Sequence, residues 1–287
     1  MVFTSLVNLF LILLFSLSGV PAFQYSDAVS LNLKPGVSAE MVTAEKAAVL
    51  VNGSHYFLFS KNADEVQPIA SITKLMTALV FLENNPGWEK EYKIQEADHV
   101  NGGRLNLFLG ERVTVKDLFY TSLVASDNGA TLALAHATGL SEAEFVSKMN
   151  LKAKHLGLVK TSFSDPSGLS DADVSTAREV AWLASAALER PEIREATSQA
   201  EYRFQTLSGT DKFIESTDYL LFSEESGPLK ILGGKTGYTD KAGYSFVGLW
   251  QNQDGKEFIS VVLNSQGRND RFLDSRQLAN WVVAAYN

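Results

Sequence analysis

The order of apolar and polar positions divides the chain into a strand-rich start, a helical middle and a strand-rich end. Two apolar runs, Ala47–Val51 and His55–Ser60, flank an Asn-Gly pair, and this predicts a hairpin of two strands. The last third holds further apolar and β-branched runs bounded by Gly and Asp, as strands commonly are. They predict strands at Tyr202–Leu207, Lys230–Thr236, Tyr244–Gln251 and Phe258–Asn264.

The middle of the chain shows apolar residues at helical spacing. A stripe over Ser71–Glu83 predicts a helix that Asn-Asn-Pro-Gly at 84–87 would end. Three pairs of Ser or Thr with an acidic residue three positions later mark further helix starts: Thr114/Asp117, Ser141/Glu144 and Thr176/Glu179. The first of these helices breaks near 126–129, and the third ends before Pro191. A last amphipathic helix is predicted over Asp270–Tyr286.

Strands on both sides of a helical middle predict a mixed α+β fold. An antiparallel β-sheet built from both ends of the chain would be flanked by helices, with a helical subdomain inserted at about 62–200. One domain would then span 23–287. A binding site is expected where the sheet meets the insert, since ligand sites favour junctions between packed units.

Composition and charge exclude several function classes. The 287 residues are 45% hydrophobic and 20% charged, which is typical of a globular chain. The formal net charge of -8 and the pI near 5.1 argue against binding to nucleic acid or anionic membranes. Because Cys is absent, disulfides and a Cys nucleophile are excluded. The four His residues are scattered without a His-Glu-x-x-His motif, so neither a metal nor an organic cofactor is implied.

The N-terminal residues indicate the cellular compartment in which the protein acts. Leu6–Val20 is an apolar run of signal-peptide length, short for a membrane-spanning helix, and small residues follow at the usual cleavage spacing. They predict a signal peptide over 1–22 with cleavage after Ala22. The first Lys or Arg is Lys34, so the positive charge that normally precedes such a run is absent. The segment could instead be an uncleaved anchor, and both alternatives predict an exported protein.

Gly234-Lys235-Thr236 could end a phosphate-binding loop or form the edge of a substrate-binding strand. A phosphate-binding loop needs a Gly at position 229 and a helix after the Thr. Position 229 is Leu, and residues 238–249 indicate a turn followed by a strand. Lys235 is therefore expected on or beside a strand.

Ser71 and Lys74 lie three residues apart at a predicted helix start, which places both side chains on one face. A Ser hydroxyl becomes a nucleophile when a neighbouring base takes its proton, and Lys74 can act so only as a neutral amine. An ordinary Lys has a pKa near ~10.4, so roughly one in a few thousand is neutral at pH 7. Burial or a second cation such as Lys235 would lower that pKa.

Ser126-Asp127-Asn128 occupies the predicted helix break, where short polar side chains can point into a cleft. Ser126 could relay a proton to a leaving amine, and Asn128 could hold Lys74 and a substrate amide. The three residues could also simply cap a helix. The Ser-x-Asn pattern has low specificity by itself, since it also occurs at 30–32 and 60–62.

The combination of Ser-x-x-Lys, Ser-x-Asn and Lys-Thr-Gly, each in a suitable context, is more specific. It resembles the serine D-alanyl-D-alanine peptidases, which are low-molecular-mass penicillin-binding proteins of the β-lactamase/transpeptidase-like fold. Longer stretches resemble that family in the same order: Pro68–Ala78, Glu111–Ala130, Phe163–Glu179 and Gly233–Gly248.

The resemblance implies a role for each candidate residue. Ser71 would be the acylated nucleophile, Lys74 its base, and Ser126 the third catalytic residue. Four residues of the strand edge and one from the helix break would bind the substrate: Asn128, Lys235, Thr236, Gly237 and Tyr238. The backbone N–H groups of Ser71 and Tyr238 would form the oxyanion hole.

The resemblance further implies peptidoglycan stem peptides as substrates and β-lactams as covalent inhibitors, in the periplasm or elsewhere in the cell envelope outside the cytoplasm. A D-Ala-D-Ala carboxypeptidase is the first reading, and an endopeptidase that cuts D-Ala–diaminopimelate cross-bridges is the alternative. Family carboxypeptidases often carry an Asn-Arg-Asn before the Lys-Thr-Gly strand, but Glu215–Tyr219 contains no Arg. They also often carry a second β-rich domain and a C-terminal membrane helix, and neither is expected after Asn264.

Two further alternatives are a β-lactamase and a non-catalytic penicillin-binding module. Class A β-lactamases deacylate through a Glu-activated water, and no Glu-x-x-Leu-Asn follows Ser126 to supply that Glu. Intact Ser71, Lys74 and Lys235 argue against a module that has lost catalysis.

Overall fold

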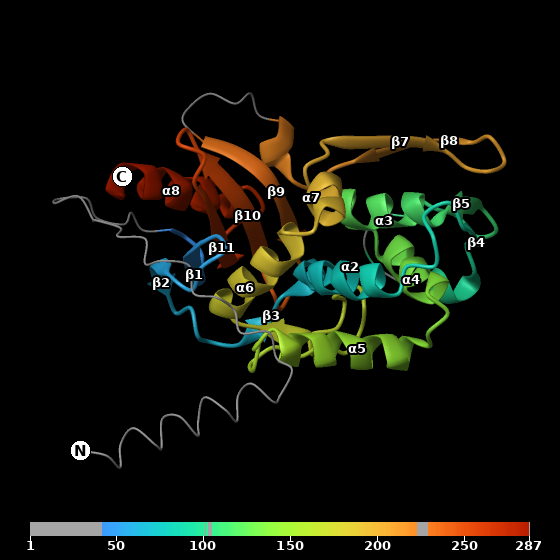
Figure 1. The fold of residues 1–287 in the computed structure, drawn as a ribbon, viewed down its shortest axis with the longest axis horizontal. Coiled ribbons are helices and arrows are strands. Elements are labelled where there is room, and N and C mark those ends of the chain that lie inside the picture. The colour runs from blue at the N-terminus through green and yellow to red at the C-terminus, as the bar shows by residue number, and fades with distance from the viewer. Residues whose placement is uncertain (1–41, 101, 103–104, 223–228, 287) are drawn as a thin grey trace, which may run out of the picture. The chain divides into compact units, whose positions relative to one another are not determined.

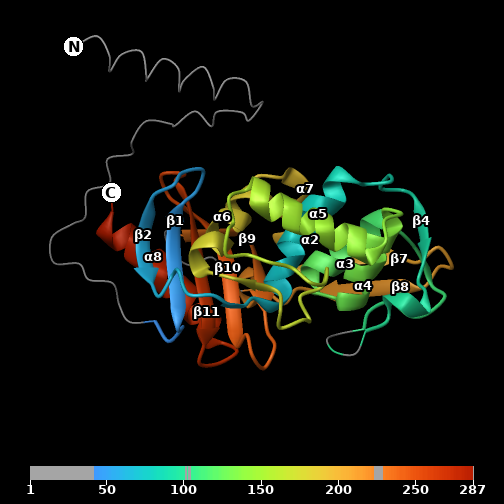
Figure 2. The ribbon, with the colours of Figure 1, turned by 90° about the horizontal axis from the view of Figure 1, so that it is seen from below.

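The computed structural model describes residues 42–286 apart from 101, 103–104 and 223–228, so the leader expected at 1–22 lies outside the described residues. A five-stranded antiparallel sheet has the order β2-β1-β11-β10-β9 (Figures 1 and 2). Its strands are β1 (Lys46–Val51), β2 (Phe57–Lys61), β9 (Leu229–Gly237), β10 (Tyr244–Asn252) and β11 (Glu257–Ser265). Strands from both ends of the chain thus form one sheet, and the predicted α+β class is confirmed.

Most of the described helices lie between β2 and β9. They are η1 (Ala70–Thr73), α2 (Lys74–Glu83), η2 (Glu96–Asp98), α3 (Val115–Val124), α4 (Asn128–Ala137), α5 (Glu142–His155), α6 (Ala177–Leu188), α7 (Pro191–Thr197) and η3 (Tyr219–Phe222), with α8 (Asp270–Ala285) after the last strand. Three short antiparallel strand pairs connect them: β3 (Gln67–Pro68) with β6 (Val174–Ser175), β4 (Glu91–Lys93) with β5 (Arg112–Thr114), and β7 (Glu201–Gln205) with β8 (Asp211–Glu215).

Each face of the large sheet packs on a helix. Helix α8 contacts β10 and β11 on one face, where Phe246, Trp250, Phe272 and Val282 are buried together. Helix α6 contacts β1, β10 and β11 on the other face. The core on that side continues into α2, α3 and α4, which lie beside the sheet in Figure 1. The start of α2 therefore meets the edge strand β9, and this junction positions the site.

Most of the predicted helix starts are formed as the sequence indicates. The capping boxes at the starts of α3 and α5 have both of their hydrogen bonds. At α6 the Thr176 hydroxyl accepts from the Glu179 N–H. The Glu179 carboxylate, however, accepts from the Lys160 N–H and the Thr161 hydroxyl, so it ties another loop to the helix.

Several details differ from the sequence expectations. Strand β2 begins at Phe57, and residues 70–73 form a 3₁₀ turn before α2 starts at Lys74. Helix α7 is not among the predicted helices, since Pro191 predicts the end of the helix before it. Pro also favours the first position of a new helix, and this is the position that Pro191 takes in α7. Strand β8 was missed as well; it is one half of a hairpin whose exposed positions alternate with partly buried ones.

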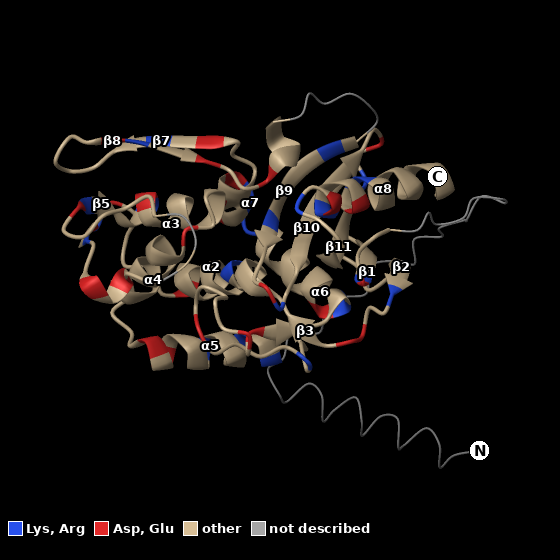
Figure 3. Cartoon of the chain, turned by 180° about the vertical axis from the view of Figure 1, so that it is seen from behind, with Lys and Arg blue, Asp and Glu red and all other residues tan. Residues whose placement is uncertain are grey.

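Charge is distributed over the described elements. In Figure 3, Lys and Arg are interspersed with Asp and Glu rather than gathered into one stripe on the described chain. None of the helices described is both long and apolar enough to cross a membrane.

Candidate active site

Ser71 is positioned by the 3₁₀ turn that leads into α2. The preceding residue, Ala70, has a φ of 50°, which turns the chain sharply before the nucleophile. In a 3₁₀ turn the side chains of residues three apart lie above one another, so Ser71 and Lys74 face the same side. Lys74 Nζ donates to Ser71 Oγ at 2.9 Å.

Lys74 is fully buried and has three oxygen acceptors. Besides Ser71 they are Asn128 Oδ1 at 2.7 Å and the Ser167 carbonyl at 2.6 Å. Burial lowers the pKa of Lys74 to about 7, against the opposing effect of nearby carboxylates, of which Asp165 is the strongest. A large fraction of Lys74 is therefore neutral at pH 7, whereas an ordinary Lys is almost entirely protonated.

Ser126 and Asn128 lie at the break between α3 and α4. Ser126 has a φ of 58°, and its hydroxyl accepts from Lys235 Nζ at 2.8 Å. The capping expected of this tripeptide is done by Asp127, whose carboxylate accepts from the Ala130 N–H. The side chains on both sides of Asp127 are thus left to face the pocket.

The opposite side of the pocket is the end of β9. Lys235 is buried, and its pKa lies well below the ordinary value because of burial and, after it, the charges of Lys74 and Arg271. Thr236 Oγ1 lies 2.7 Å from Thr217 Oγ1. A Cβ on Gly237 would lie 2.7 Å from the carbonyl oxygen of Ile69, so only Gly lets β9 approach the 3₁₀ turn this closely.

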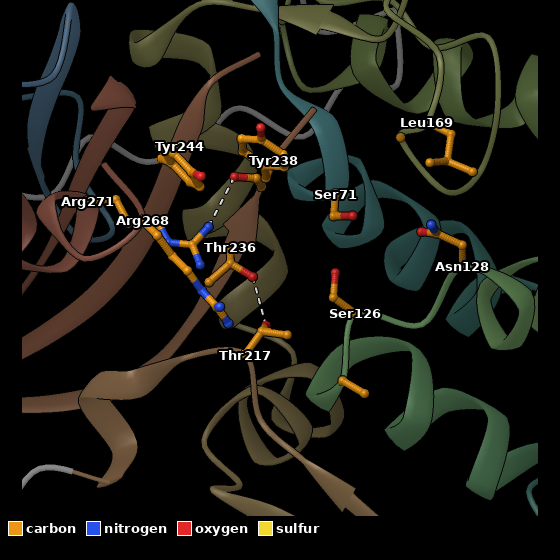
Figure 4. Close-up of a pocket in the computed structure, with 13 residues that line it drawn as sticks. Ser71, Ser126, Asn128, Leu169, Thr217, Thr236, Tyr238, Tyr244, Arg268 and Arg271 are labelled. Atoms are coloured by element: carbon orange, nitrogen blue, oxygen red, sulfur yellow. Dashed lines mark hydrogen bonds between the residues drawn. The ribbon is translucent and has the colours of Figure 1, made fainter. Parts of the chain in front are cut away.

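Six of the eight predicted residues line a cavity of about 390 Å³ (Figure 4): Ser71, Ser126, Asn128, Thr236, Gly237 and Tyr238. The other two, Lys74 and Lys235, are buried behind the lining and contact it through hydrogen bonds to Ser71 and Ser126. Figure 4 places Leu169 across the pocket from Tyr238 and Tyr244, whose rings stack with centroids 4.4 Å apart.

Solved structures of known proteins share this fold. Residues 34–267 match the family model described as D-alanyl-D-alanine carboxypeptidase. The chain belongs to this family.

Named relatives and a solved structure agree with that assignment. The chain is 35% identical over 208 residues to a D-alanyl-D-alanine endopeptidase of Haemophilus influenzae, an alignment that covers 71% of this chain and 70% of that one. It is 30% identical over 258 residues to the D-alanyl-D-alanine carboxypeptidase DacF of Bacillus subtilis, covering 87% of this chain and 64% of the relative. Penicillin-binding protein D2 of Listeria monocytogenes, solved with cefotaxime bound, is 34% identical with a TM-score of 0.74, covering 85% and 98%.

The protein is thus a serine-type D-alanyl-D-alanine peptidase, and the family predicted from the sequence is confirmed. Its pocket also contains Arg268 and Arg271, which the sequence did not predict: Arg268 precedes α8, and Arg271 lies in the first turn of that helix. Arg271 is buried, donates to the Gly237 carbonyl at 3.3 Å and lies over the Tyr244 ring. Burial and the charge of Arg268 lower the pKa of Arg271 to about 10.

No pattern in the sequence marks these arginines, because neither belongs to a motif and Arg271 is simply the second residue of a helix. The family pattern predicts an Arg in the stretch before β9, and Glu215–Tyr219 contains none. In the structure, Arg268 and Arg271 supply cationic side chains to this pocket instead (Figure 4), and Arg268 donates to the Tyr219 hydroxyl of that same stretch.

Proposed function

We propose that this protein is a D-alanyl-D-alanine carboxypeptidase that cleaves peptidoglycan stem peptides through an acyl-enzyme on Ser71. The observation that carries the proposal is the 2.9 Å hydrogen bond from Lys74 Nζ to Ser71 Oγ. It joins a hydroxyl that lines the pocket to a buried amine whose pKa is about 7.

Acylation follows from this geometry. Neutral Lys74 takes the proton of Ser71 as the serine oxygen attacks the carbonyl carbon of the penultimate D-Ala. The negative charge that forms on the carbonyl oxygen is stabilised by the backbone N–H groups of Ser71 and Tyr238. When the C–N bond breaks, Ser126 relays to the leaving amine the proton that Lys74 took from Ser71, so Lys74 is neutral again, and the contact of Ser126 with Lys235 keeps it oriented. Water then hydrolyses the ester and restores Ser71.

The binding roles follow from position. Strand β9 is an edge strand of the sheet, so an extended peptide can pair with it beside Thr236 and Gly237. Asn128 Nδ2 donates one of its two N–H groups to the Gly102 carbonyl at 3.1 Å. The side-chain amide of Asn128 can therefore also donate to a carbonyl of a bound peptide. Arg268 and Arg271 place positive charge at the β9 side of the pocket, where the terminal carboxylate of a carboxypeptidase substrate would lie.

An endopeptidase is the second candidate, because the relative from Haemophilus influenzae and one from Escherichia coli, 30% identical over 279 residues, both bear that name. Such an enzyme cuts the amide between D-Ala and the diaminopimelate of a cross-bridge. Its leaving group extends beyond the pocket, so it depends less on an Arg within Glu215–Tyr219. The chemistry at Ser71 would be the same.

Inhibition and location form part of the proposal. The β-lactam complex of the Listeria relative supports acylation of Ser71 by penicillins and cephalosporins. Peptidoglycan lies outside the cytoplasm, so the apolar leader would direct export with cleavage after Ala22. N-terminal sequencing of exported protein tests this, and a first residue other than Phe23 would contradict that cleavage site.

The deciding experiment is a digest followed by mass spectrometry. Purified protein and its Ser71→Ala variant are each incubated with pentapeptide monomers and with cross-linked dimers from peptidoglycan. Loss of one D-Ala from monomers, absent with the variant, is expected for a carboxypeptidase. Splitting of dimers without that loss would assign the endopeptidase instead, and no Ser71-dependent product from either substrate would refute the peptidase mechanism.

A further inference from the structure

A turn that follows α5 in the chain packs against the catalytic lysine, and one carboxylate organises it. Asp165 Oδ1 accepts from the Ser167 N–H at 2.5 Å, the Ser167 hydroxyl at 2.6 Å and the Gly168 N–H at 2.8 Å. Asp165 Oδ2 accepts from the Ser170 N–H at 2.7 Å. A carboxylate that accepts four such bonds fixes the backbone of residues 167–170 around itself.

That turn presents its backbone to the nucleophile's helix. The Ser167 carbonyl accepts from Lys74 Nζ at 2.6 Å, and the Pro166 carbonyl accepts from the Thr77 hydroxyl at 2.5 Å. Gly168 lies so close that a Cβ on it would come within 2.1 Å of the Ala70 carbonyl oxygen. The turn is therefore in contact with the residue before Ser71 and with the amine after it.

Asp165 also contributes charge to the site. Its pKa is lowered, because the hydrogen bonds from Ser167, Ser170 and Gly168 outweigh the effect of burial. It is therefore ionised at neutral pH. Among the carboxylates that favour the protonated form of Lys74, Asp165 has the largest effect.

Other charged groups around Lys74 are already engaged elsewhere. Asp127 caps α4 and accepts from both the backbone and the side chain of Asn106. Asp173 accepts from Ser164, and its pKa is raised to about 6 by burial and by Asp165. Lys235 contributes a like charge from β9.

We propose that Asp165 is a positioning residue for the acylation of Ser71: it holds the Ser167 carbonyl on the Lys74 amine and places a negative charge beside it. This inference rests on the proposed function, in which Lys74 is the base. A residue that only stabilised the loop would change the amount of folded enzyme and leave the titration of Lys74 in place. Asp165 changes both the geometry and the titration.

The test is the rate of acylation by a fluorescent penicillin, measured across the pH range in which Lys74 titrates. Asp165→Asn keeps the shape and removes the charge. The maximal rate is expected to fall by about tenfold or more, since misplacement by ~1 Å costs up to ~100-fold. Loss of a nearby negative charge disfavours protonated Lys74, so the low-pH limb should move to lower pH by about one unit.

The matched control is Asp171→Asn, which removes the same charge from the same loop. Asp171 is exposed and its ion pair is with Lys241 at 3.2 Å, so its variant should match the native rate and pH limb. Ser71→Ala shows whether acylation occurs at Ser71 at all, and so separates failure of the proposed function from failure of this inference.

Two results would overturn the inference: an Asp165→Asn enzyme with native maximal rate, or one with a reduced rate and an unmoved pH limb. If urea titrations show that Asp165→Asn is unfolded, Ser167→Ala is used in its place. Ser167→Ala removes one hydrogen bond to Asp165 and keeps the charge of the Asp165 carboxylate. A lower maximal rate with a native pH limb is then expected, and a native rate would contradict the positioning role.

Discussion

The contact between Gly168 and the nucleophile's turn yields a quantitative prediction for Gly168→Ala. Gly168 has a φ of 83°, and a Cβ there would lie 2.1 Å from the Ala70 carbonyl oxygen. Gly209 has a φ of 86° and nothing within 4 Å of its Cβ position. Both Ala variants bear the left-handed backbone penalty of about 1–2 kcal/mol. Only Gly168→Ala must also move the turn or Ala70, and overpacking of this kind costs about 1–3 kcal/mol.

The free energy of unfolding should therefore fall by about 2–5 kcal/mol for Gly168→Ala and by about 1–2 kcal/mol for Gly209→Ala. Urea unfolding followed by tryptophan fluorescence measures both. Because the displaced turn carries the Ser167 carbonyl, acylation by penicillin should slow by up to ~100-fold in Gly168→Ala alone. Equal losses of stability in the two variants, or unchanged acylation in Gly168→Ala, would refute the reasoning.

Three further predictions concern a proton, a carboxylate and a helix cap. Acylation requires neutral Lys74, whose pKa is about 7. The rate of acylation should therefore rise tenfold per pH unit below pH 7 and level off above it. An acylation rate that does not depend on pH through this range would exclude Lys74 as the base. Asp274→Ala should destabilise the fold by about 3–5 kcal/mol, because the buried carboxylate accepts four hydrogen bonds, from Thr43, Ala44 and Ser265. Urea unfolding measures the loss, and the control is the exposed Asp254→Ala, for which we expect almost no change in stability. Ser141→Ala should cost about 1 kcal/mol through loss of the α5 cap and leave acylation unchanged, and a loss of acylation would mean that α5 acts on the site.

Much of this architecture was predictable because its determinants are local. The apolar run in Tyr244–Gln251 and the capping pairs at Thr114 and Ser141 depend on neighbouring residues only, and the structure has the corresponding strand and helices. The Ser71–Lys74 spacing is equally local, and it predicts the shared face whether the segment is α-helical or 3₁₀. The joining of three motifs into one pocket came from the family resemblance, since no local rule places β9 beside α2.

The parts that were not predicted depend on tertiary contacts. Arg268 and Arg271 enter the pocket because α8 packs on β10 and β11, and Arg271 donates to the Gly237 carbonyl at the end of β9. Nothing in their own neighbourhood in the sequence indicates this packing. Asp165 lies in an Asp-Pro-Ser-Gly sequence that indicates only a turn. Its importance appears once that turn is seen against Lys74.

The burial of the two lysines has a cost in stability that can be worked out for Lys74. A shift of the Lys74 pKa from 10.5 to about 7 corresponds to about 5 kcal/mol of differential interaction. Since the folded pKa lies below the unfolded one, this burial lowers stability progressively as pH falls from the ordinary lysine range to about 7, and no further below that. The pKa of Lys235 is depressed in the same way, partly by Lys74.

With both amines in one site, protonation of either disfavours protonation of the other. A substrate carboxylate near Thr236 and Arg271 would favour the proton on Lys235, the lysine on that strand. Lys74 is then the amine that stays neutral beside Ser71. Under the proposed function, binding of the anion and preparation of the base would thus be coupled through the repulsion between two ammonium groups, and the unfavourable burial of both lysines would have a role in the reaction.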